Sequence, residues 1–336
     1  MSKRRWPLPF IKYSGAGNDF IILDAREETP IGNPGSLAKA LCRRGRSVGA
    51  DGLIVIEGPD DKVPGDSLPR MRLWNADGSA AEISGNGARC VARFLVDHGA
   101  SAESISFRTD IGVVTAQVTG DLCRLQLPTS GIVFPNRRLR VEGRHLTGTY
   151  VEVGVPFFVC FHDNPDELAV RFLGRAIRNH PKLAPRGANV DFVRVDDEQR
   201  LFFRVFERGV EAETLSSGTG SLAAALASAA AGKVASPVVC EARGAALTVR
   251  FRHVAHAIPG TGPTTNQPPG GASEGTNSTE SAEGQNIRDE SPELPELVRE
   301  TGPSDRIEFV DLEIEGDAMP IYRGEALVEA SRSPRR

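Results

Sequence analysis

Two segments of the 336-residue chain place a serine directly before a glycine-rich turn. The first contains Ser84-Gly85-Asn86-Gly87 and the second contains Ser217-Gly218-Thr219-Gly220, and an apolar run long enough for a helix follows each. Glycine before a helix lets backbone N–H groups face a ligand, and the helix N-terminus favours an anion. Each segment therefore predicts a helix N-terminus that can bind a carboxylate, with a serine hydroxyl beside it.

The spacing of the two motifs predicts two related domains. Ser84 and Ser217 are 133 residues apart, about the length of one domain. If the two helix N-termini face each other across a cleft, they would hold one small acid and place a hydroxyl on each face of the same carbon. That geometry suits a reaction in which one group removes a proton and another supplies one. Each motif alone is short, so the prediction depends on the pair.

Composition excludes several classes of protein. The chain has 40 Lys+Arg and 44 Asp+Glu, a formal net charge of −4, which argues against a nucleic-acid-binding protein. No stretch approaches the ~18 consecutive apolar residues of a membrane helix, and no signal-peptide pattern follows the basic residues 1–10. Five scattered cysteines without a CxxC pair argue against a disulfide framework and a metal site. We expect a cytoplasmic protein with no membrane partner.

Periodicity predicts many short strands and few helices. Strand candidates are residues 20–23, 53–56, 70–74, 113–118, 122–127 and 201–206. An amphipathic helix is expected over residues 166–178, ended by His180-Pro181. The run 222–231 has almost no polar face, so we expect strands to surround this helix.

Residues 259–305 differ from the rest of the chain because they are mostly Gly, Pro, Ser, Thr, Asn and Glu. Such a segment cannot bury enough apolar surface to offset its ordering entropy. Strand-like residues 247–251 precede it, and residues 307–309 and 312–314 follow it. The sequence therefore predicts a disordered insertion, an enlarged loop between two strands.

An ordered set of motifs resembles the diaminopimelate epimerase family. The segments are Lys12-Tyr13-Ser14-Gly15-Ala16-Gly17-Asn18-Asp19-Phe20, Gly49-Ala50-Asp51-Gly52, Trp74-Asn75-Ala76-Asp77-Gly78-Ser79, Gly85-Asn86-Gly87-Ala88-Arg89-Cys90, Gly187-Ala188-Asn189-Val190-Asp191-Phe192, Glu207-Arg208-Gly209-Val210, Gly218-Thr219-Gly220, Gly316-Asp317-Ala318 and Tyr322-Arg323-Gly324-Glu325. The resemblance implies an α+β (mixed α/β) fold with two pseudo-symmetric domains, each a mixed sheet or barrel wrapped around a central apolar helix. The expected domains are 6–136, completed by a strand near 319–330, and 137–318.

The resemblance also implies a reaction and a set of site residues. The reaction is a cofactor-independent interconversion of LL- and meso-diaminopimelate by two-base proton transfer at the α-carbon, in lysine biosynthesis. The protein is expected to be a homodimer with a small amino-acid substrate. Ser84 and Ser217 take the catalytic positions. The substrate-binding residues would be Gly85, Asn86, Gly218 and Thr219 at the reacting carboxylate, and Asn18, Asn75, Asn189, Glu207 and Arg208 at the distal end.

Two departures from the family pattern leave the activity open. The family has cysteines where Ser84 and Ser217 stand, and a serine hydroxyl needs an adjacent base to become reactive. Glu82 and Glu213 are the nearby candidates in the sequence. The family also has Asn and His at Val155 and Phe157 of the segment Val155-Pro156-Phe157, and each lost polar contact costs ~1–3 kcal/mol.

Three functions therefore remain possible from the sequence. The first is an epimerase acting on diaminopimelate. The second is a racemase or dehydratase of the same superfamily that acts on another amino acid. The third is a catalytically inactive homologue that binds an amino acid. Cys90, six residues after Ser84, is expected to be structural, because the family has a cysteine there as well.

Overall fold

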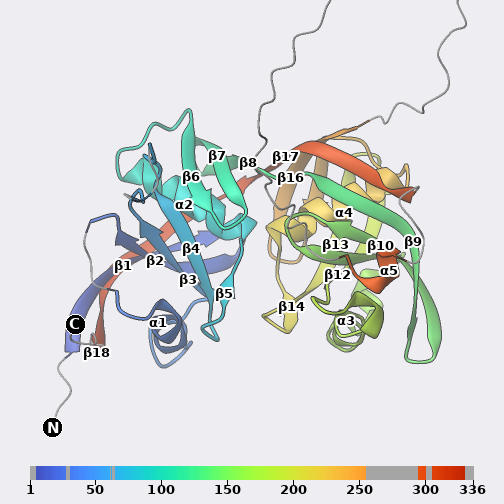
Figure 1. Cartoon of the computed structure of the whole chain (residues 1–336), viewed down its shortest axis with the longest axis horizontal. Coiled ribbons are helices and arrows are strands. Elements are labelled where there is room, and N and C mark those ends of the chain that lie inside the picture. The colour runs from blue at the N-terminus through green and yellow to red at the C-terminus, as the bar shows by residue number, and fades with distance from the viewer. Residues whose placement is uncertain are drawn as a thin grey trace, which may run out of the picture. The chain divides into compact units, whose positions relative to one another are not determined.

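The computed structural model describes residues 5–27, 31–60, 62, 65–254, 294–299 and 305–329 (Figure 1). Within this part of the chain, 18 strands form one continuous hydrogen-bonded sheet, and five α-helices and two 3-10 helices accompany it. The α+β class expected from the sequence is confirmed. Most of the predicted insertion, residues 259–305, lies outside the described residues.

We call residues 5–126 and 319–329 the N-terminal lobe. Its helices are α1 (Pro34–Leu41) and α2 (Gly85–Asp97). Its strands are β1 (Arg5–Gly15), β2 (Asn18–Ala25), β3 (Gly52–Glu57), β4 (Arg70–Asn75), β5 (Ala80–Ala81), β6 (Ile105–Thr109), β7 (Gly112–Thr119), β8 (Leu122–Gln126) and β18 (Met319–Glu329).

We call residues 131–254, 295–299 and 305–317 the C-terminal lobe. Its helices are α3 (Val170–Arg178), α4 (Gly218–Ala230), α5 (Glu296–Arg299), η1 (Pro165–Glu167) and η2 (Pro181–Leu183). Its strands are β9 (Gly131–Val141), β10 (Arg144–Glu152), β11 (Pro156–Phe161), β12 (Asn189–Asp197), β13 (Arg200–Glu207), β14 (Ala212–Thr214), β15 (Val238–Glu241), β16 (Ala246–His253) and β17 (Ile307–Asp317).

Strand pairing repeats from one lobe to the other. In the N-terminal lobe β2 pairs parallel with β3, β3 antiparallel with β4, and β4 with both β5 and β6. In the C-terminal lobe β11 pairs parallel with β12, β12 antiparallel with β13, and β13 with both β14 and β15. The crossover helices α1 and α3 occupy corresponding places in this order. The internal sequence repeat therefore reflects a repeat of topology.

The two motif helices are the centres of the lobes. Helix α2 contacts strands β1, β2, β6, β7 and β8, and helix α4 contacts strands β9 to β13 and β15 to β17 (Figure 1). Helix α4 is buried continuously from Gly218 to Ser228, as the apolar run predicted. A helix with no polar face must be surrounded because any exposed side would leave apolar surface in water.

Strand β18 closes the N-terminal lobe through antiparallel pairing with β1. Strand β17 pairs with β8 of one lobe and with β9 and β16 of the other, so it links the two lobes. The expected boundary between residues 136 and 137 falls within β9, and the division into 6–136 and 137–318 stays a prediction.

Two local expectations differ from the structure. The helix predicted over residues 166–178 is divided into η1 and α3, and Phe172 of α3 is 59% exposed. Within the predicted insertion, helix α5 buries Leu297 and Val298 against the C-terminal lobe. Burial of these two apolar side chains stabilises the position of α5 against the C-terminal lobe.

Among the helices that the structure describes, none has the length and apolar character needed to cross a lipid bilayer.

Candidate active site

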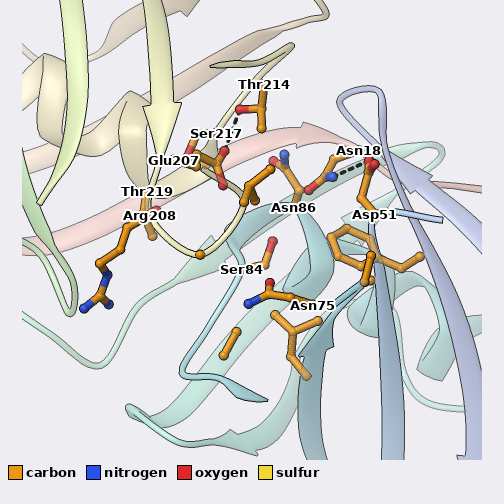
Figure 2. Close-up of a pocket in the computed structure, with 18 of the residues that line it drawn as sticks. Asn18, Asp51, Asn75, Ser84, Asn86, Glu207, Arg208, Thr214, Ser217 and Thr219 are labelled. Carbon is orange, nitrogen blue, oxygen red and sulfur yellow. Dashed lines mark hydrogen bonds between the residues drawn. The ribbon is translucent and has the colours of Figure 1, made fainter. Parts of the chain in front are cut away.

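One cavity of about 1410 Å³ lies where the two motif helices begin. All eleven residues expected at the site line it: Asn18, Asn75, Ser84, Gly85, Asn86, Asn189, Glu207, Arg208, Ser217, Gly218 and Thr219. The structure thus brings together residues that are up to 201 positions apart in the chain, from Asn18 to Thr219. Figure 2 shows Ser84 and Asn75 on one side of the cavity, and Ser217, Glu207 and Thr214 on the other.

The two serines have almost the same backbone and the same local role. Each is the N-cap of its helix, with φ −132° and ψ 122° at Ser84 and φ −143° and ψ 123° at Ser217. Ser84 Oγ accepts the N–H of Gly87 at 3.1 Å, and Ser217 Oγ accepts the N–H of Gly220 at 3.2 Å. An N-cap serine satisfies one free N–H group of its helix and keeps its own O–H for another partner.

The helix N-termini meet in close contact. A Cβ atom placed on Gly85 would lie 3.2 Å from the Cα of Gly218. Free N–H groups of both first turns therefore converge on one region, where two helix dipoles add. This arrangement suits a carboxylate and any negative charge that develops on it during a reaction.

The carboxylate region is held together by buried polar contacts that the sequence pattern did not indicate. Asn86 is 1% exposed, and its Nδ2 donates to Ser216 Oγ at 3.2 Å. Ser216 in turn donates to the backbone oxygen of Ala16 at 2.7 Å. This chain of contacts joins α2 to the loop before α4 and to the turn between β1 and β2. It fixes how the two helix N-termini sit against each other.

Arg89 provides a positive charge behind the first turn of α2. Its side chain is fully buried and donates to Asn86 Oδ1 at 2.8 Å and to the backbone oxygen of Gly85 at 3.3 Å. Burial lowers the pKa of this guanidinium from its ordinary value. A buried arginine beside a helix N-terminus strengthens the attraction for an anion. The sequence motif contains Arg89, but nothing in the pattern indicated that its side chain points inward.

Glu207 lines the cavity together with Ser217. Glu207 accepts a hydrogen bond from Thr214 Oγ1 at 2.7 Å (Figure 2). Burial raises the pKa of Glu207 above its ordinary value, and the hydroxyls of Thr214 and Ser217 offset part of the rise. Among the residues that the structure describes, no carboxylate forms a hydrogen bond with Ser84.

Glu82 and Glu213, the nearest acidic residues in sequence, have other partners. Glu82 pairs with Arg208 across the cavity at 3.2 Å. Glu213 accepts two hydrogen bonds of 2.7 Å from the guanidinium of Arg204. Both carboxylates are therefore already engaged with an arginine, whereas Glu207 forms no ion pair among the described residues.

A second acid lies beside Glu207. The side chain of Asp191 is fully buried, and neither of its carboxyl oxygens has a hydrogen-bond partner among the described residues. Burial raises the pKa of Asp191 well above its ordinary value, and the charge of Glu207 adds to the rise. Burial therefore disfavours the ionised form of Asp191, and a charge on Glu207 disfavours it further, since two neighbouring buried carboxylates cannot both ionise cheaply.

No cysteine supplies a thiolate at this site. All five cysteines of the chain lie in the part that the structure describes, and all are buried free thiols. Cys42 is the one that lines the cavity, and burial together with Asp19 and Asp51 raises its pKa to about 12. Cys90 is packed in the core of the N-terminal lobe, and burial raises its pKa as well. Thiols with raised pKa values remain protonated near neutral pH.

On the expected distal side, Asn189 connects strand ends. Its Oδ1 accepts the backbone N–H of Arg208 at 2.8 Å, and its Nδ2 donates to the backbone oxygen of Pro156 at 3.1 Å. Asn189 therefore positions Arg208, whose side chain reaches toward Glu82. Asn75 donates to Ser79 Oγ at 2.9 Å, within the turn that follows β4.

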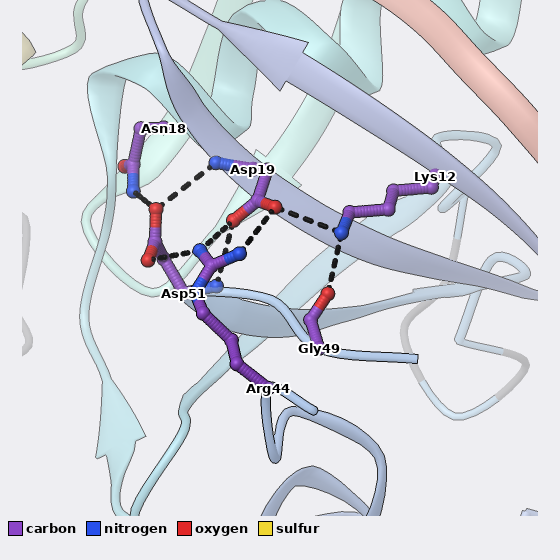
Figure 3. Close-up of polar contacts among 6 residues, drawn as sticks. All are labelled: Lys12, Asn18, Asp19, Arg44, Gly49 and Asp51. Atoms are coloured by element: carbon purple, nitrogen blue, oxygen red, sulfur yellow. Dashed lines mark hydrogen bonds and ion pairs between the residues drawn. The ribbon is translucent and has the colours of Figure 1, made fainter. Parts of the chain in front are cut away.

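An ion-pair network holds Asn18 (Figure 3). Asn18 Nδ2 donates to Asp51 Oδ2 at 2.6 Å, and Arg44 contacts both Asp51, at 2.7 Å, and Asp19. Lys12 lies 2.8 Å from Asp19. Burial would raise the pKa of Asp19, but hydrogen bonds from Arg44 and Lys12 outweigh it and lower the pKa to about 2. Asn18 is thus fixed by charges that do not themselves need to contact a ligand.

In the segment Val155-Pro156-Phe157, the two apolar residues lie in different places. Val155 lines the cavity, so an apolar side chain faces the ligand region there. Phe157 is fully buried in the core and does not line the cavity. Of the two apolar replacements noted in the sequence, Val155 is the one placed to affect a bound substrate.

Comparisons with known proteins agree with the motifs. The sequence model described as diaminopimelate epimerase matches residues 10–126 and 149–266. The diaminopimelate epimerase of Aquifex aeolicus is 37% identical over 255 residues, which are 73% of this chain and 90% of that protein. The diaminopimelate epimerase of a Hydrogenobaculum species is 39% identical over 238 residues, 68% of this chain and 85% of that protein.

Solved structures share the fold at lower identity. A PhzF-family phenazine biosynthesis protein of Bacillus anthracis has a TM-score of 0.61 and 14% identity, covering 96% of this chain and 100% of its own. A hydroxyproline epimerase of Agrobacterium vitis has a TM-score of 0.59 and 13% identity, covering 97% of this chain and 94% of its own. These likenesses show the two-domain pseudo-symmetric fold. Because a family model and relatives above 30% identity match most of its length, the chain belongs to the diaminopimelate epimerase family.

Proposed function

We propose that this protein is an isomerase of the diaminopimelate epimerase type, which interconverts LL- and meso-diaminopimelate by moving a proton at one α-carbon. Family membership supports the reaction and its place in lysine biosynthesis. The proposal assigns proton transfer to Ser84 and Ser217, and substrate binding to the other nine residues that line the cavity with them.

The observation that carries the proposal is the contact of two helix N-termini at Gly85 and Gly218, each capped by a serine of the same backbone geometry. The α-proton of an amino acid is a very weak acid, so its removal must be helped by stabilising the negative charge that spreads into the carboxylate. Converging backbone N–H groups and a buried Arg89 provide that stabilisation. The proposal therefore assigns this stabilisation to groups of the chain itself.

The test is incorporation of deuterium. Purified protein is incubated with LL-diaminopimelate in heavy water, and the α-carbons are followed by NMR and mass spectrometry. We expect deuterium at one α-carbon together with formation of the meso form. Absence of label at high enzyme concentration would contradict the proposal.

Val155 favours a second candidate, a racemase or dehydratase that acts on a different amino acid. An apolar side chain in the cavity leaves a polar distal group of diaminopimelate without one partner. Proline, hydroxyproline and histidine enantiomers in the same heavy-water assay test this candidate. Binding of an amino acid by calorimetry without any exchange would instead indicate an inactive homologue.

We also infer that the protein is a cytoplasmic homodimer. Exposed apolar side chains on β18 support a second copy, among them Ile321, Tyr322 and Leu327 with exposed fractions of 51%, 44% and 65%. Burying these side chains against another subunit would remove apolar surface from water. Sedimentation equilibrium of the full chain at micromolar concentration tests the dimer, and a monomer there would contradict it.

A further inference from the structure

Two arginines that the family resemblance does not assign to the site also line the cavity. Arg178 is the last residue of α3, and Arg186 lies between η2 and β12. Together with Arg208 they form a group of three guanidiniums, which we call the arginine cluster. The charge of this cluster determines which substrate groups this part of the cavity can accept.

Glu211 connects Arg178 to the turn that carries Arg208. Its Oε1 accepts Arg178 Nε at 3.1 Å and the backbone N–H of Gly209 at 3.2 Å. Gly209 also approaches the N-terminal lobe, since a Cβ atom on it would lie 3.3 Å from Asn75 Nδ2. Arg178 is therefore held at the end of the cavity where Arg208 and Asn75 lie.

Glu152 fixes Arg186 in the same region. The two carboxylate oxygens of Glu152 accept Arg186 Nη1 at 3.1 Å and Nη2 at 3.3 Å, and the hydroxyl of Tyr150 donates to Glu152 at 2.9 Å. Gly187 follows in the chain, and a Cβ atom on it would overlap Arg178 Nη1. The guanidinium of Arg178 therefore packs against the backbone beside Arg186.

The arginine cluster faces the cavity, whereas most of its acidic partners do not. All three arginines line the cavity, but only one of the three glutamates that pair with them does. That glutamate is Glu82, the partner of Arg208, while Glu152 and Glu211 are not on the cavity wall. A guanidinium has five N–H groups, of which these glutamates accept one or two in each pair. The cluster therefore presents positive charge and further donors to a ligand.

We propose that Arg178 and Arg186 act with Arg208 to bind a carboxylate at the distal end of the substrate, and that the distal amino group of diaminopimelate is not required. The substrate class is then the α-amino acids with a second carboxylate at the far end of the carbon chain. This inference rests on the proposed function, and it adds two specificity-determining residues to those that the family resemblance implies.

The surroundings of the cluster favour a carboxylate over an ammonium group. A planar guanidinium matches a carboxylate with two parallel hydrogen bonds, and it repels an ammonium group because their charges have the same sign. The side chain of Val155 lines the cavity and offers an ammonium group no acceptor. Glu82 would attract an ammonium group, but Arg208 already lies 3.2 Å from its carboxylate. Binding at the distal end therefore depends on the carboxylate.

Three substrates test this specificity in the heavy-water assay. L-2-Aminopimelate keeps the chain length and both carboxylates of diaminopimelate but lacks the distal amino group. L-Lysine keeps the distal amino group but lacks the distal carboxylate. We expect kcat/KM of exchange for L-2-aminopimelate to lie within ~5-fold of the value for LL-diaminopimelate, and the value for L-lysine to be ~100-fold lower or less.

Matched variants separate an anion site from a structural ion pair. Arg178→Gln removes a charge that faces the cavity, whereas Glu211→Gln removes the acid behind it and leaves the guanidinium in place. We expect Arg178→Gln and Arg186→Gln each to raise KM for L-2-aminopimelate by ~10-fold or more with kcat nearly unchanged, because the bound substrate and the transition state lose the same contact. Glu211→Gln should leave KM unchanged or lower it.

Arg175→Gln is the control for the loss of a positive charge. Arg175 is exposed on α3, three residues before Arg178, and does not line the cavity. This substitution should leave KM unchanged. Thermal unfolding of each variant checks that the fold is retained.

Two results would overturn the inference: exchange of L-lysine as efficient as that of L-2-aminopimelate, or an equal rise in KM for Arg178→Gln and Glu211→Gln. A wild-type protein that exchanges none of the three substrates would contradict the proposed function instead. Calorimetry would then still test the arginine cluster, because tighter binding of L-2-aminopimelate than of L-lysine supports the inference and equal binding overturns it.

Discussion

Gly85 and Gly218 bring the backbones of the two halves of the site into close approach: a Cβ atom on Gly218 would lie 3.0 Å from the Cα of Gly85. Atoms at that distance repel, and the neighbouring atom belongs to a backbone that cannot turn aside. The absence of a side chain at both positions is what lets the two helix N-termini approach each other this closely.

Gly218→Ala should separate the two helix N-termini. We expect a loss of about 1–3 kcal/mol of stability from overpacking and a loss of exchange activity larger than the stability change explains. Thermal unfolding and the heavy-water assay measure the two effects. The control is Gly120→Ala, at a positive φ of 58° with open space around it and outside the cavity. The prediction fails if both variants lose stability and activity alike.

Ser84→Cys/Ser217→Cys should raise the rate of exchange. A thiol with an ordinary pKa near 8.5 ionises far more readily than a serine hydroxyl, so each face gains a base that needs no helper. We expect an increase of ~100-fold or more, the usual contribution of a positioned acid or base. The rate with LL-diaminopimelate in heavy water is the measurement. An unchanged rate would contradict the prediction and indicate that substrate binding, rather than the proton-transfer groups, limits exchange.

Val155→Asn tests the apolar side chain in the cavity. If diaminopimelate is the substrate, the amide should restore a polar contact worth ~1–3 kcal/mol and lower KM by roughly 10-fold or more. The comparison is made in the wild type and in the double-cysteine variant. Phe157→His serves as a contrast, because Phe157 is buried away from the cavity and a polar ring there should destabilise the fold without improving KM.

Asp191→Asn should alter the dependence of stability on pH. In the unfolded chain Asp191 ionises near pH 4, whereas burial keeps it protonated in the folded protein to higher pH. The folded state thus binds the extra proton, and wild-type stability falls as the pH rises through this window. The variant lacks this titration. Its free energy of unfolding, relative to that of the wild type, should therefore rise by about 1.4 kcal/mol per pH unit. Urea unfolding at a series of pH values from about pH 4 upward measures it. A constant difference would contradict the burial of an unpartnered acid.

Arg44→Met tests the network that holds Asn18. The low pKa of Asp19, about 2, means that its ion pairs stabilise the fold above about pH 4 and that this contribution is lost as the pH falls toward 2. Because the side chain of Arg44 is 58% exposed, solvent screens the pair, and we expect a loss of only about 1 kcal/mol at neutral pH. KM should rise because Asn18 loses a fixed partner in Asp51.

The matched control for Arg44→Met is Arg46→Met, a change at an exposed arginine two residues away that does not line the cavity. It should leave both the urea midpoint and KM unchanged. Equal effects of the two substitutions would show that net charge, rather than the contacts of Arg44, accounts for the result.

Much of the site follows from sequence pattern because its parts are local. A serine before glycines and an apolar helix predicts an N-cap, and both Ser84 and Ser217 cap their helices. The strands predicted from apolar runs at residues 20–23, 53–56 and 201–206 lie within β2, β3 and β13. Helix α3 begins at Val170 rather than at Asp166. The predicted start is wrong because the residue before the observed start, Ala169, has no side chain that could cap the helix. The sequence therefore carries no local signal that marks Val170 as the first residue of α3.

The sequence by itself determined the internal repeat, the two helices with serine N-caps, and eleven of the residues that line the cavity. Those features depend on residue types and short spacings. Only the tertiary structure decided the partners of the acids near Ser217: Glu207 is held by the hydroxyl of Thr214, while Glu213, nearer in sequence, is held by Arg204. The physical reason is that burial and ion pairing set the strength of an acid or base, and both arise from contacts between distant segments that spacing along the chain does not specify.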